Sequence, residues 1–456
     1  MKDHYDVIIV GGGIIGTSLL YTLANFSDIK KILLIEKNYD IALSTSSSRN
    51  NAQTLHVGDI ETNYNLQKVI ETKAASEMLL EYTKMLDKKK SSGTIFPVSK
   101  MVLGVGEEEV EAIEKRYDKK FLSLFDHIKK VQKKEIGKLE PAVVKGRDPR
   151  EKIIGAYSPT GYMINFGKVA RSFVDSSKNK KDKEIDIHLN ETAKKVSEKR
   201  NVYELITNKN IYAANFIVFA TGGYSLYFAK SLLYAQDLSV LSVGGNFYYS
   251  KKVLNGKVYR VQKGNIPFAA VHGDPDIDYP NRSRFGPTID IVPFLEKADL
   301  GTTFDYIKTA GLDKDAIESL LHIISDRDII EIMAKNVAYS MPELGKFIFV
   351  KEEVNKIVPT LKHEDLVPDP NAGGIRPQII DKKNKKLLLG EIEVKKDGLI
   401  FVMAPSPGAS SCLKVALNDS LQITDYLGRK FHKEKFLNMF TKNEKQRKAI
   451  LNSLKK

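Results

Sequence analysis

The sequence contains only one cysteine, Cys412, among its 456 residues. An internal disulfide is therefore impossible, and neither a multi-cysteine zinc site nor an iron–sulfur cluster fits this composition. So low a cysteine content agrees with a reducing compartment.

Long apolar runs are also missing. No stretch approaches the roughly 18 consecutive apolar residues that indicate a membrane-spanning helix. No secretory signal is visible, because the N-terminus enters a predicted strand at once. With 42% hydrophobic and 28% charged residues, the sequence is typical of a soluble globular protein. Its length is enough for two or three domains.

Acidic residues are outnumbered by basic ones, and the formal net charge is +14. Nucleic acid, an anionic membrane surface or an anionic substrate could each explain this excess. More than half of it lies in residues 429–456, which hold ten basic residues and two glutamates. The remainder is spread thinly, which argues against a nucleic-acid groove in the body of the protein.

A glycine-rich turn near the N-terminus gives the strongest indication of function. The apolar run Val7–Val10 is followed by Gly11, Gly13 and Gly16, and then by a helical pattern. A second apolar run ends at Glu36, 20 residues past Gly16. This order predicts a pyrophosphate at the helix N-terminus and a ribose hydroxyl on Glu36. Together these features favour a dinucleotide site over a buried turn without a ligand.

Three further segments have the composition of cofactor contacts. The polar run Ser44–Asn51 suits hydrogen bonding to a diphosphate, a ribityl chain or a ring edge, although a solvated linker is the alternative. Phe216–Gly223 is an apolar strand that ends in Ala-Thr-Gly, as in flavoproteins with two dinucleotide-binding folds. Ala404–Ser411 is a Pro/Gly turn that opens a helical pattern. The N-terminus of such a helix suits a partial negative charge, such as the edge of a reduced flavin.

Residues 236–350 have a different pattern, in which short β-rich runs precede helical segments. We interpret this region as a separate substrate domain, built on a sheet with helices.

Six motifs resemble the FAD-dependent malate:quinone oxidoreductases, especially their short ε-proteobacterial branch, within the D-amino-acid-oxidase-like flavoproteins. The motifs are VIIVGGGIIG, SSSRNNAQTLHVGDIETNY, IPFAAVHGDPD, RFGPT, GGIRPQIID and APSPGASSCL. They lie between residues 7 and 413, so the resemblance covers about nine-tenths of the chain. The third and fourth motifs are the most restrictive. APSPGAS is also similar to the 2-hydroxyglutarate enzymes.

The resemblance implies an α/β protein with a Rossmann-like FAD-binding domain assembled from discontinuous segments, plus an α+β substrate domain. The expected FAD domain comprises residues 1–85, 150–235 and 360–430. The expected substrate domain comprises residues 86–149 and 236–359, and residues 431–456 form a basic tail. FAD should be non-covalent, because Cys412 lies inside the closing helix pattern. Electrons should pass to a membrane quinone.

The resemblance also assigns residues to FAD. It places one set of residues at the adenosine-diphosphate half of FAD, a second set near the diphosphate and a third set at the pyrimidine edge of the ring. These residues are Gly11, Gly13, Gly16, Glu36, Lys37, Ser48, Asn50, Asn51, Ala193, Thr221, Gly222, Gly408, Ala409 and Ser410.

Oxidation of a 2-hydroxy acid also requires a base for the hydroxyl proton. His272 precedes Gly273 and Asp274, and the Asp274 carboxylate could orient its imidazole. His272 is therefore the first candidate and His56 is the second. The alternative for both is a hydrogen-bonded structural histidine.

The same reaction requires a cation for the substrate carboxylates, and a guanidinium binds a carboxylate with two hydrogen bonds. Arg284 and Arg376 lie in the motifs and are the first candidates for the clamp. Arg49 is a third candidate that could hold phosphate instead. For any one of them a surface salt bridge is the alternative.

The leading hypothesis is oxidation of (S)-malate to oxaloacetate, with malate as the dicarboxylate substrate and a quinone as acceptor. The second is quinone- or oxygen-linked oxidation of another 2-hydroxy acid, such as L-2-hydroxyglutarate or lactate. The third is a flavin-containing nucleic-acid-binding protein, which the distribution of charge disfavours, so we expect no nucleic-acid partner.

The tail has apolar residues near one helical face, among them Phe436, Phe440 and Ile450. A basic amphipathic helix is typical of a membrane-surface element. We therefore expect a cytoplasmic protein, peripheral on the inner face of the cytoplasmic membrane and bound to anionic lipid through this tail. The alternative is that the aromatic residues pack on the FAD domain.

Overall fold

The structure is a computed structural model. It describes residues 3–86, 93–178, 180–199, 202–262, 270–297, 299–311, 313–325, 327–339, 341, 343–369, 372–388, 392–404 and 408–454. Parts of three predicted segments lie outside these residues, namely 266–269, 405–407 and 455–456. None of the described helices is both long enough and apolar enough to cross a membrane.

The first of three sheets contains the predicted strand–turn–helix–strand unit. Its strands are β1 (Asp3–Val10), β2 (Lys31–Ile35), β6 (Glu184–His188), β7 (Ala193–Lys199), β8 (Val202–Thr207), β9 (Ile211–Phe219), β19 (Ile392–Lys396) and β20 (Leu399–Ala404). Its parallel core has the order β20–β9–β1–β2–β6. β19 pairs antiparallel with β20, and the hairpin β7–β8 joins β9.

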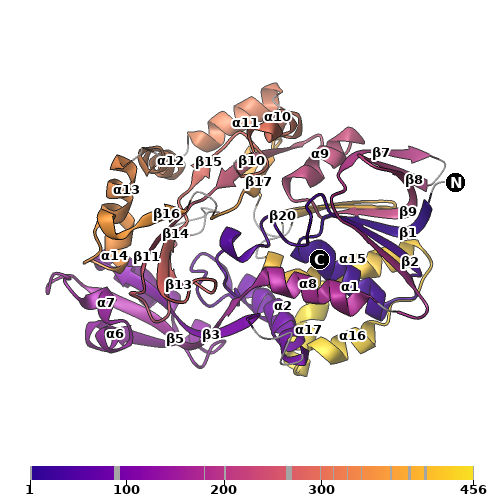
Figure 1. The fold of residues 1–456 in the computed structure, drawn as a ribbon. Coiled ribbons are helices and arrows are strands. Elements are labelled where there is room, and N and C mark those ends of the chain that lie inside the picture. Colours follow the sequence, from indigo (N-terminus) through magenta and orange to yellow (C-terminus); the bar gives the residue numbers. More distant parts are fainter. Residues whose placement is uncertain are drawn as a thin grey trace.

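Helices cover both faces of this sheet (Figure 1). They are α1 (Ile14–Phe26), α8 (Phe166–Ser177), α9 (Gly223–Ser231) and α15 (Gly408–Tyr426), and α2 (Leu66–Met85) packs against α15. Val7 and Ile9 of β1 belong to the core shared with α1, α8 and α15. Ile8 and Val10 belong to the core on the α9 side. A strand buried on both faces explains why β1 reads as a continuous apolar run.

The second and third sheets form the other part of the molecule. The second has the order β15 (Asp290–Ile291), β10 (Leu238–Gly244), β17 (Arg376–Asp381) and β18 (Lys386–Leu387). The third has the order β16 (Val367–Asp369), β11 (Phe247–Lys251), β14 (Arg282–Gly286), β13 (His272–Pro275), β12 (Lys257–Arg260), β3 (Ile95–Val105), β5 (Ile153–Ile164) and β4 (Lys129–Gln132).

The remaining helices lie mainly around these two sheets and at the C-terminus. They are α4 (Glu107–Arg116), α5 (Lys119–Leu122), α6 (Lys133–Leu139), α7 (Pro141–Val144), α10 (Thr303–Ala310), α11 (Lys314–Ile324), α12 (Arg327–Tyr339), α13 (Leu344–Phe349), α14 (Asn355–Ile357), α16 (Lys433–Phe440) and α17 (Glu444–Ser453). Short 3₁₀ turns lie at Ser48–Asn50, Leu300–Thr302 and His363–Asp365, and a π-helical turn at Val350–Val354.

Strand pairing divides the chain differently from the predicted domain boundaries at two places. β5 lies in a segment predicted for the FAD domain, but it pairs with β3 and β4 in the third sheet. β17 was also expected there, but it pairs with β10 in the second sheet. Both strands therefore belong to sheets of the predicted substrate domain, and so does β16, which pairs with β11 in the third sheet.

The C-terminal tail does not present its apolar face to solvent. Phe436, Leu437, Phe440 and Ile450 are buried in the core that includes α1 and α2. The ring of Phe436 lies 5.1 Å from that of Phe26, measured between centroids. The predicted membrane-facing role of these side chains is therefore wrong, and the packing alternative describes α16 and α17.

Candidate functional site

One large cavity of ≈ 940 Å³ lies against the carboxyl ends of β1 and β2 and extends to the third sheet. We call one part of its wall the glycine end, formed by Gly11, Gly13, Glu36, Thr221 and Gly222. We call the other part the histidine end, formed by His56, His272, Arg376 and Ser410. Residues from six predicted sequence segments therefore line a single space.

The glycine end depends on close backbone packing. Gly11 has a φ of +111°, and a Cβ there would lie 2.4 Å from the carbonyl oxygen of Ala220. A Cβ on Gly16 would lie 2.0 Å from the carbonyl oxygen of Gly11. Gly16, which the resemblance assigns to FAD, lies outside the cavity wall, and its lack of a side chain lets α1 pack closely on the turn after β1. The first turn of α1, with Gly13 and Ile14, opens into the cavity.

Glu36 projects from the end of β2 into this end of the cavity. Its Oε2 accepts a hydrogen bond of 2.6 Å from the Gly12 backbone N–H, and its Oε1 accepts one of 2.9 Å from the Asn38 N–H. Lys37 also lines the cavity and pairs with Glu296. The Glu36 carboxylate can accept hydrogen bonds from ribose hydroxyls, and the backbone N–H groups at the N-terminus of α1 can donate to the neighbouring phosphates.

The predicted polar run Ser44–Asn51 is divided among different surroundings. Asn51 lines the large cavity, and so does the predicted cofactor residue Ala193. Ser48 donates a hydrogen bond of 2.6 Å to Asp278 and is outside the cavity wall. Asn50 lines a smaller cavity nearby. The sequence therefore indicates the right segment but not which of its side chains face the space.

The first turn of α15 closes the histidine end. Gly408, Ala409 and Ser410 all line the cavity. The Ser410 hydroxyl accepts a hydrogen bond of 2.9 Å from the His56 backbone N–H. This contact fixes the His56 loop against the closing helix.

His56 forms a pair with Glu61, an acid five residues further along the same loop. His56 Nδ1 lies 2.5 Å from Glu61 Oε1. Burial would raise the pKa of Glu61, but the hydrogen bond and charge of His56, with Lys100, hold it below its usual value. If Glu61 accepts the Nδ1–H, the lone pair lies on Nε2. No other described residue bonds Nε2, and His56 lines the cavity.

His272 is placed very differently, although it also lines the cavity. Its side chain is 1% exposed, and its ring stacks on Tyr259 with centroids 4.9 Å apart. Burial lowers its pKa to about 3, although Asp274 acts in the opposite direction. The distance from Nε2 to Asp274 Oδ1 is 3.7 Å, and Nε2 has no hydrogen-bond partner among the described residues. His272 is therefore neutral and too weakly basic to hold a proton at neutral pH.

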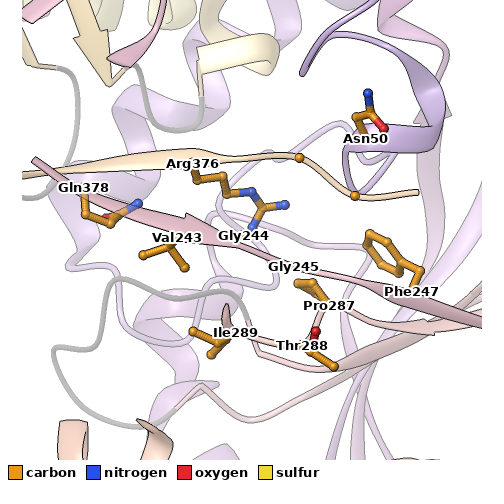
Figure 2. Close-up of a pocket in the computed structure, with 12 residues that line it drawn as sticks. Asn50, Val243, Gly244, Gly245, Phe247, Pro287, Thr288, Ile289, Arg376 and Gln378 are labelled. Atoms are coloured by element: carbon orange, nitrogen blue, oxygen red, sulfur yellow. The ribbon is translucent and has the colours of Figure 1, made fainter. Parts of the chain in front are cut away.

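Arg376 lies at the junction of the two cavities, because it lines both. In Figure 2 its side chain extends from β17 into the middle of the residues that surround the smaller cavity. Within the described part of the chain, no carboxylate pairs with its guanidinium. Burial lowers its pKa, and the nearby Arg284 cation acts in the same direction. An unpaired cation in this setting attracts an anion.

Arg284 belongs to a buried ion cluster behind the cavity wall. Its Nη2 donates to Asp274 Oδ2 at 3.1 Å and its Nη1 to the Asn51 carbonyl at 3.1 Å. Lys257 also pairs with Asp274 and donates to the Ala52 carbonyl. Arg284 lines neither of the two cavities, and the predicted clamp role stays a prediction. Arg284 supports the loop that forms part of the cavity wall.

Several residues of the wall were not predicted. Glu61 could have been found, because an acid close to a histidine in one loop is a recognisable pair. Gln53, Thr54 and Tyr259 could not, because their positions follow from strand pairing. Arg49, the third candidate cation, forms an ion pair of 2.5 Å with Asp369 and lines neither cavity.

Solved structures with a similar fold include two oxidases. One is a dithionite-reduced L-α-glycerophosphate oxidase from Mycoplasma pneumoniae with FAD bound (TM-score 0.62, 20% identity, 93% of this chain and 95% of that one). The other is a glycine oxidase from Geobacillus kaustophilus (TM-score 0.63, 17% identity, 97% of this chain and 100% of that one). At these identities the similarity concerns the fold.

Sequence comparison identifies the family. The family model described as malate:quinone oxidoreductase matches residues 3–449. A malate:quinone oxidoreductase from Helicobacter pylori is 37% identical over 446 residues, which cover 96% of this chain and 98% of that protein. A probable malate:quinone oxidoreductase from Campylobacter jejuni is 36% identical, with 95% and 98% covered. With a match over nearly the whole length, the chain belongs to the malate:quinone oxidoreductase family.

Proposed function

We propose that this protein oxidises (S)-malate to oxaloacetate with FAD and passes the electrons to a membrane quinone. The observation that carries the proposal is that one cavity joins the glycine end to the histidine end. A dinucleotide site and a group of acid–base and cationic side chains therefore share one space. Membership of the malate:quinone oxidoreductase family supports the same reaction.

The residues at the glycine end fit FAD. Gly11 and Gly13 would let backbone approach the diphosphate, and Glu36 would hold the adenosine ribose. Gly408, Ala409 and Ser410 would lie along the flavin ring. The cavity volume of ≈ 940 Å³ is near the upper limit of about 300–1,000 Å³ for ligand sites. FAD would be non-covalent, because Cys412 is fully buried and outside the cavity wall.

Bound FAD supplies the acceptor for the hydride of the malate carbinol carbon. The protein must supply a base for the hydroxyl proton. We assign this role to His56 Nε2, because Glu61 holds Nδ1 and the ring lines the cavity. His272, the first candidate from sequence, would instead remain neutral and shape the wall, since burial lowers its pKa to about 3.

Arg376 would bind a carboxylate of malate. Its guanidinium faces both cavities and is not neutralised by a described carboxylate. A bidentate pair would orient the substrate and offset the unfavourable burial of the free cation. Because the quinone acceptor dissolves in lipid, the enzyme would work at the membrane surface, on the inner face of the cytoplasmic membrane.

The proposal is tested with purified protein and a soluble dye as acceptor. Malate should reduce the dye much faster than L-2-hydroxyglutarate or lactate does, and denaturation should release FAD. A quinone in lipid vesicles should replace the dye. Release of FMN, or turnover with lactate but not malate, would overturn the proposal.

A further inference from the structure

Exposed apolar side chains gather on the helices of residues 300–347. These helices, α10, α11, α12 and α13, lie along one edge of the molecule in Figure 1. Soluble proteins usually expose large apolar side chains singly. Here Phe304 is 76% exposed and Leu321 is 62% exposed. Further exposed members of the set are Leu300, Ile307, Ile317 and Val337, with Leu344 and Phe347 on α13.

Their spacing places them on the outer faces of the helices. Leu300, Phe304 and Ile307 are separated by four and three residues, and Ile317 and Leu321 by four. Residues at these spacings share one helical face. The opposite faces are already buried, through Tyr306, Ala310, Ala316 and Ile323. α10 and α11 are therefore apolar toward the core and also toward the outside.

A basic turn lies beside this surface. The turn 382–386 between β17 and β18 contains four lysines. Lys385 lies 3.1 Å from Glu318 of α11, and Lys382 lies 2.6 Å from Asp313. These pairs hold the turn against α11 and neutralise two acids of the apolar surface. Lys383 and Lys386 remain exposed. An apolar face flanked by lysines is complementary to anionic lipid headgroups.

We propose that the outer face of α10–α13, together with the turn 382–386, docks on a lipid bilayer that contains anionic headgroups. This inference rests on the quinone-linked function proposed above, because a lipid-dissolved acceptor must be met at the bilayer surface. The docking face adjoins the large cavity, since Asp305 of α10 and Leu388 after β18 line that cavity. Helices α16 and α17 lie away from this edge in Figure 1, and Phe436, Leu437, Phe440 and Ile450 of these helices are buried.

The test measures sedimentation of the full-length protein, loaded with FAD, with vesicles of phosphatidylcholine alone or with phosphatidylglycerol. The double variant Phe304→Glu/Leu321→Glu should lower the ratio of bound to free protein at least tenfold. Lys383→Glu/Lys386→Glu should lower the same ratio by about fivefold for each lysine, and only on vesicles that contain phosphatidylglycerol. The matched control is Met439→Glu, which replaces an exposed apolar residue of α16 and should leave binding unchanged.

Turnover separates this inference from the proposed function. Each variant should keep the wild-type rate with malate and soluble dye, while turnover with vesicle quinone falls with binding. If wild-type protein does not reduce the dye with malate, the proposed function is refuted. Sedimentation with vesicles would still test the docking face, because it does not depend on turnover. Unchanged vesicle binding in both double variants would overturn the docking face. So would a wild-type dimer that Phe304→Glu/Leu321→Glu converts to a monomer, because the face would then bind a second copy.

Discussion

The two ends of the large cavity are built in different ways. At the glycine end, the wall comes largely from the backbone and one carboxylate of residues 11–36. At the histidine end it comes from side chains far apart in sequence, such as His56 and Ser410, which are separated by 354 residues. A backbone site fails when its packing is distorted. A side-chain site can lose one chemical group and keep its shape. Variants at the glycine end should therefore lose FAD, whereas variants at the histidine end should keep FAD and lose catalytic rate or substrate binding.

The largest effect is expected at the glycine end. In Gly16→Val the new Cβ would lie 2.0 Å from the carbonyl oxygen of Gly11, so α1 must move away from β1. We expect protein that contains most of its secondary structure but little FAD. Absorbance at flavin wavelengths and circular dichroism measure the two properties. Normal FAD content in this variant would show that the glycine end does not hold the cofactor.

The next largest effect should come from the base. His56→Ala should lower the rate of flavin reduction by malate about 10²–10⁴-fold, the usual contribution of a positioned base. FAD content should stay normal, because the glycine end is intact. His272→Ala should lower the same rate by less, since burial lowers the His272 pKa to about 3. Rapid mixing with malate under anaerobic conditions measures both rates.

Glu61 sharpens this test. Glu61→Gln keeps the size of the partner but lets an amide N–H face His56 Nδ1, which favours the wrong tautomer. We expect the rate of flavin reduction to fall roughly 10–100-fold, the range found when the carboxylate partner of a metal-bound histidine is replaced. A larger loss in His272→Ala than in His56→Ala would restore the order that the sequence suggested.

A smaller effect, on substrate binding, is expected at Arg376. Arg376→Met should lower kcat/KM for malate, because a desolvated charged hydrogen bond contributes about 2–5 kcal/mol. This corresponds to roughly 30-fold to several-thousandfold. Steady-state kinetics with a soluble dye measure it, and FAD content is the control. A change of less than about threefold would remove Arg376 from the substrate site.

Arg284 is the control for Arg376, because it is an arginine of the buried ion cluster and does not line the cavity. Arg284→Met removes one partner from the buried cluster around Asp274, which typically costs about 3–5 kcal/mol of stability. Chemical denaturation should detect this loss. If Arg284→Met instead raised the KM for malate without changing stability, the predicted clamp role would be restored.

The sequence predicts most of the residues that line the glycine end, because all of them except Thr221 and Gly222 lie within one local unit. The turn, the helix N-terminus and Glu36 follow from spacing alone. At the histidine end, spacing finds His56, His272 and Arg376, but it ranks His272 before His56, the reverse of the order that their burial and partners favour. Their roles depend on burial and partners, which strand pairing decides. The neighbours of His272 come from β12 and β14, and Arg284 is satisfied by Asp274 across the β13–β14 pair.

The same limit explains the tail. Its basic and apolar spacing is equally compatible with a membrane surface and with a protein surface. Phe436 and Phe440 pack into the core formed with α1 and α2. The tail sequence alone does not show which surface its apolar face contacts. Helices α10 and α11 have the opposite arrangement, because their outer apolar faces remain exposed.

The smallest effect is expected for Cys412, which lies in the helix whose first turn closes the histidine end. A covalent flavin link there would make FAD retention independent of the glycine end. Burial raises the pKa of this thiol to about 12, so the unreactive thiol form predominates near neutral pH. We therefore expect Cys412→Ala to retain FAD and malate oxidation within about twofold, since Cys behaves as a small buried hydrophobic residue. Acid precipitation should release all flavin from both proteins. Flavin that stays attached to the wild-type pellet but not to the variant would place the anchor at the histidine end, and Gly16→Val would then no longer lose its cofactor.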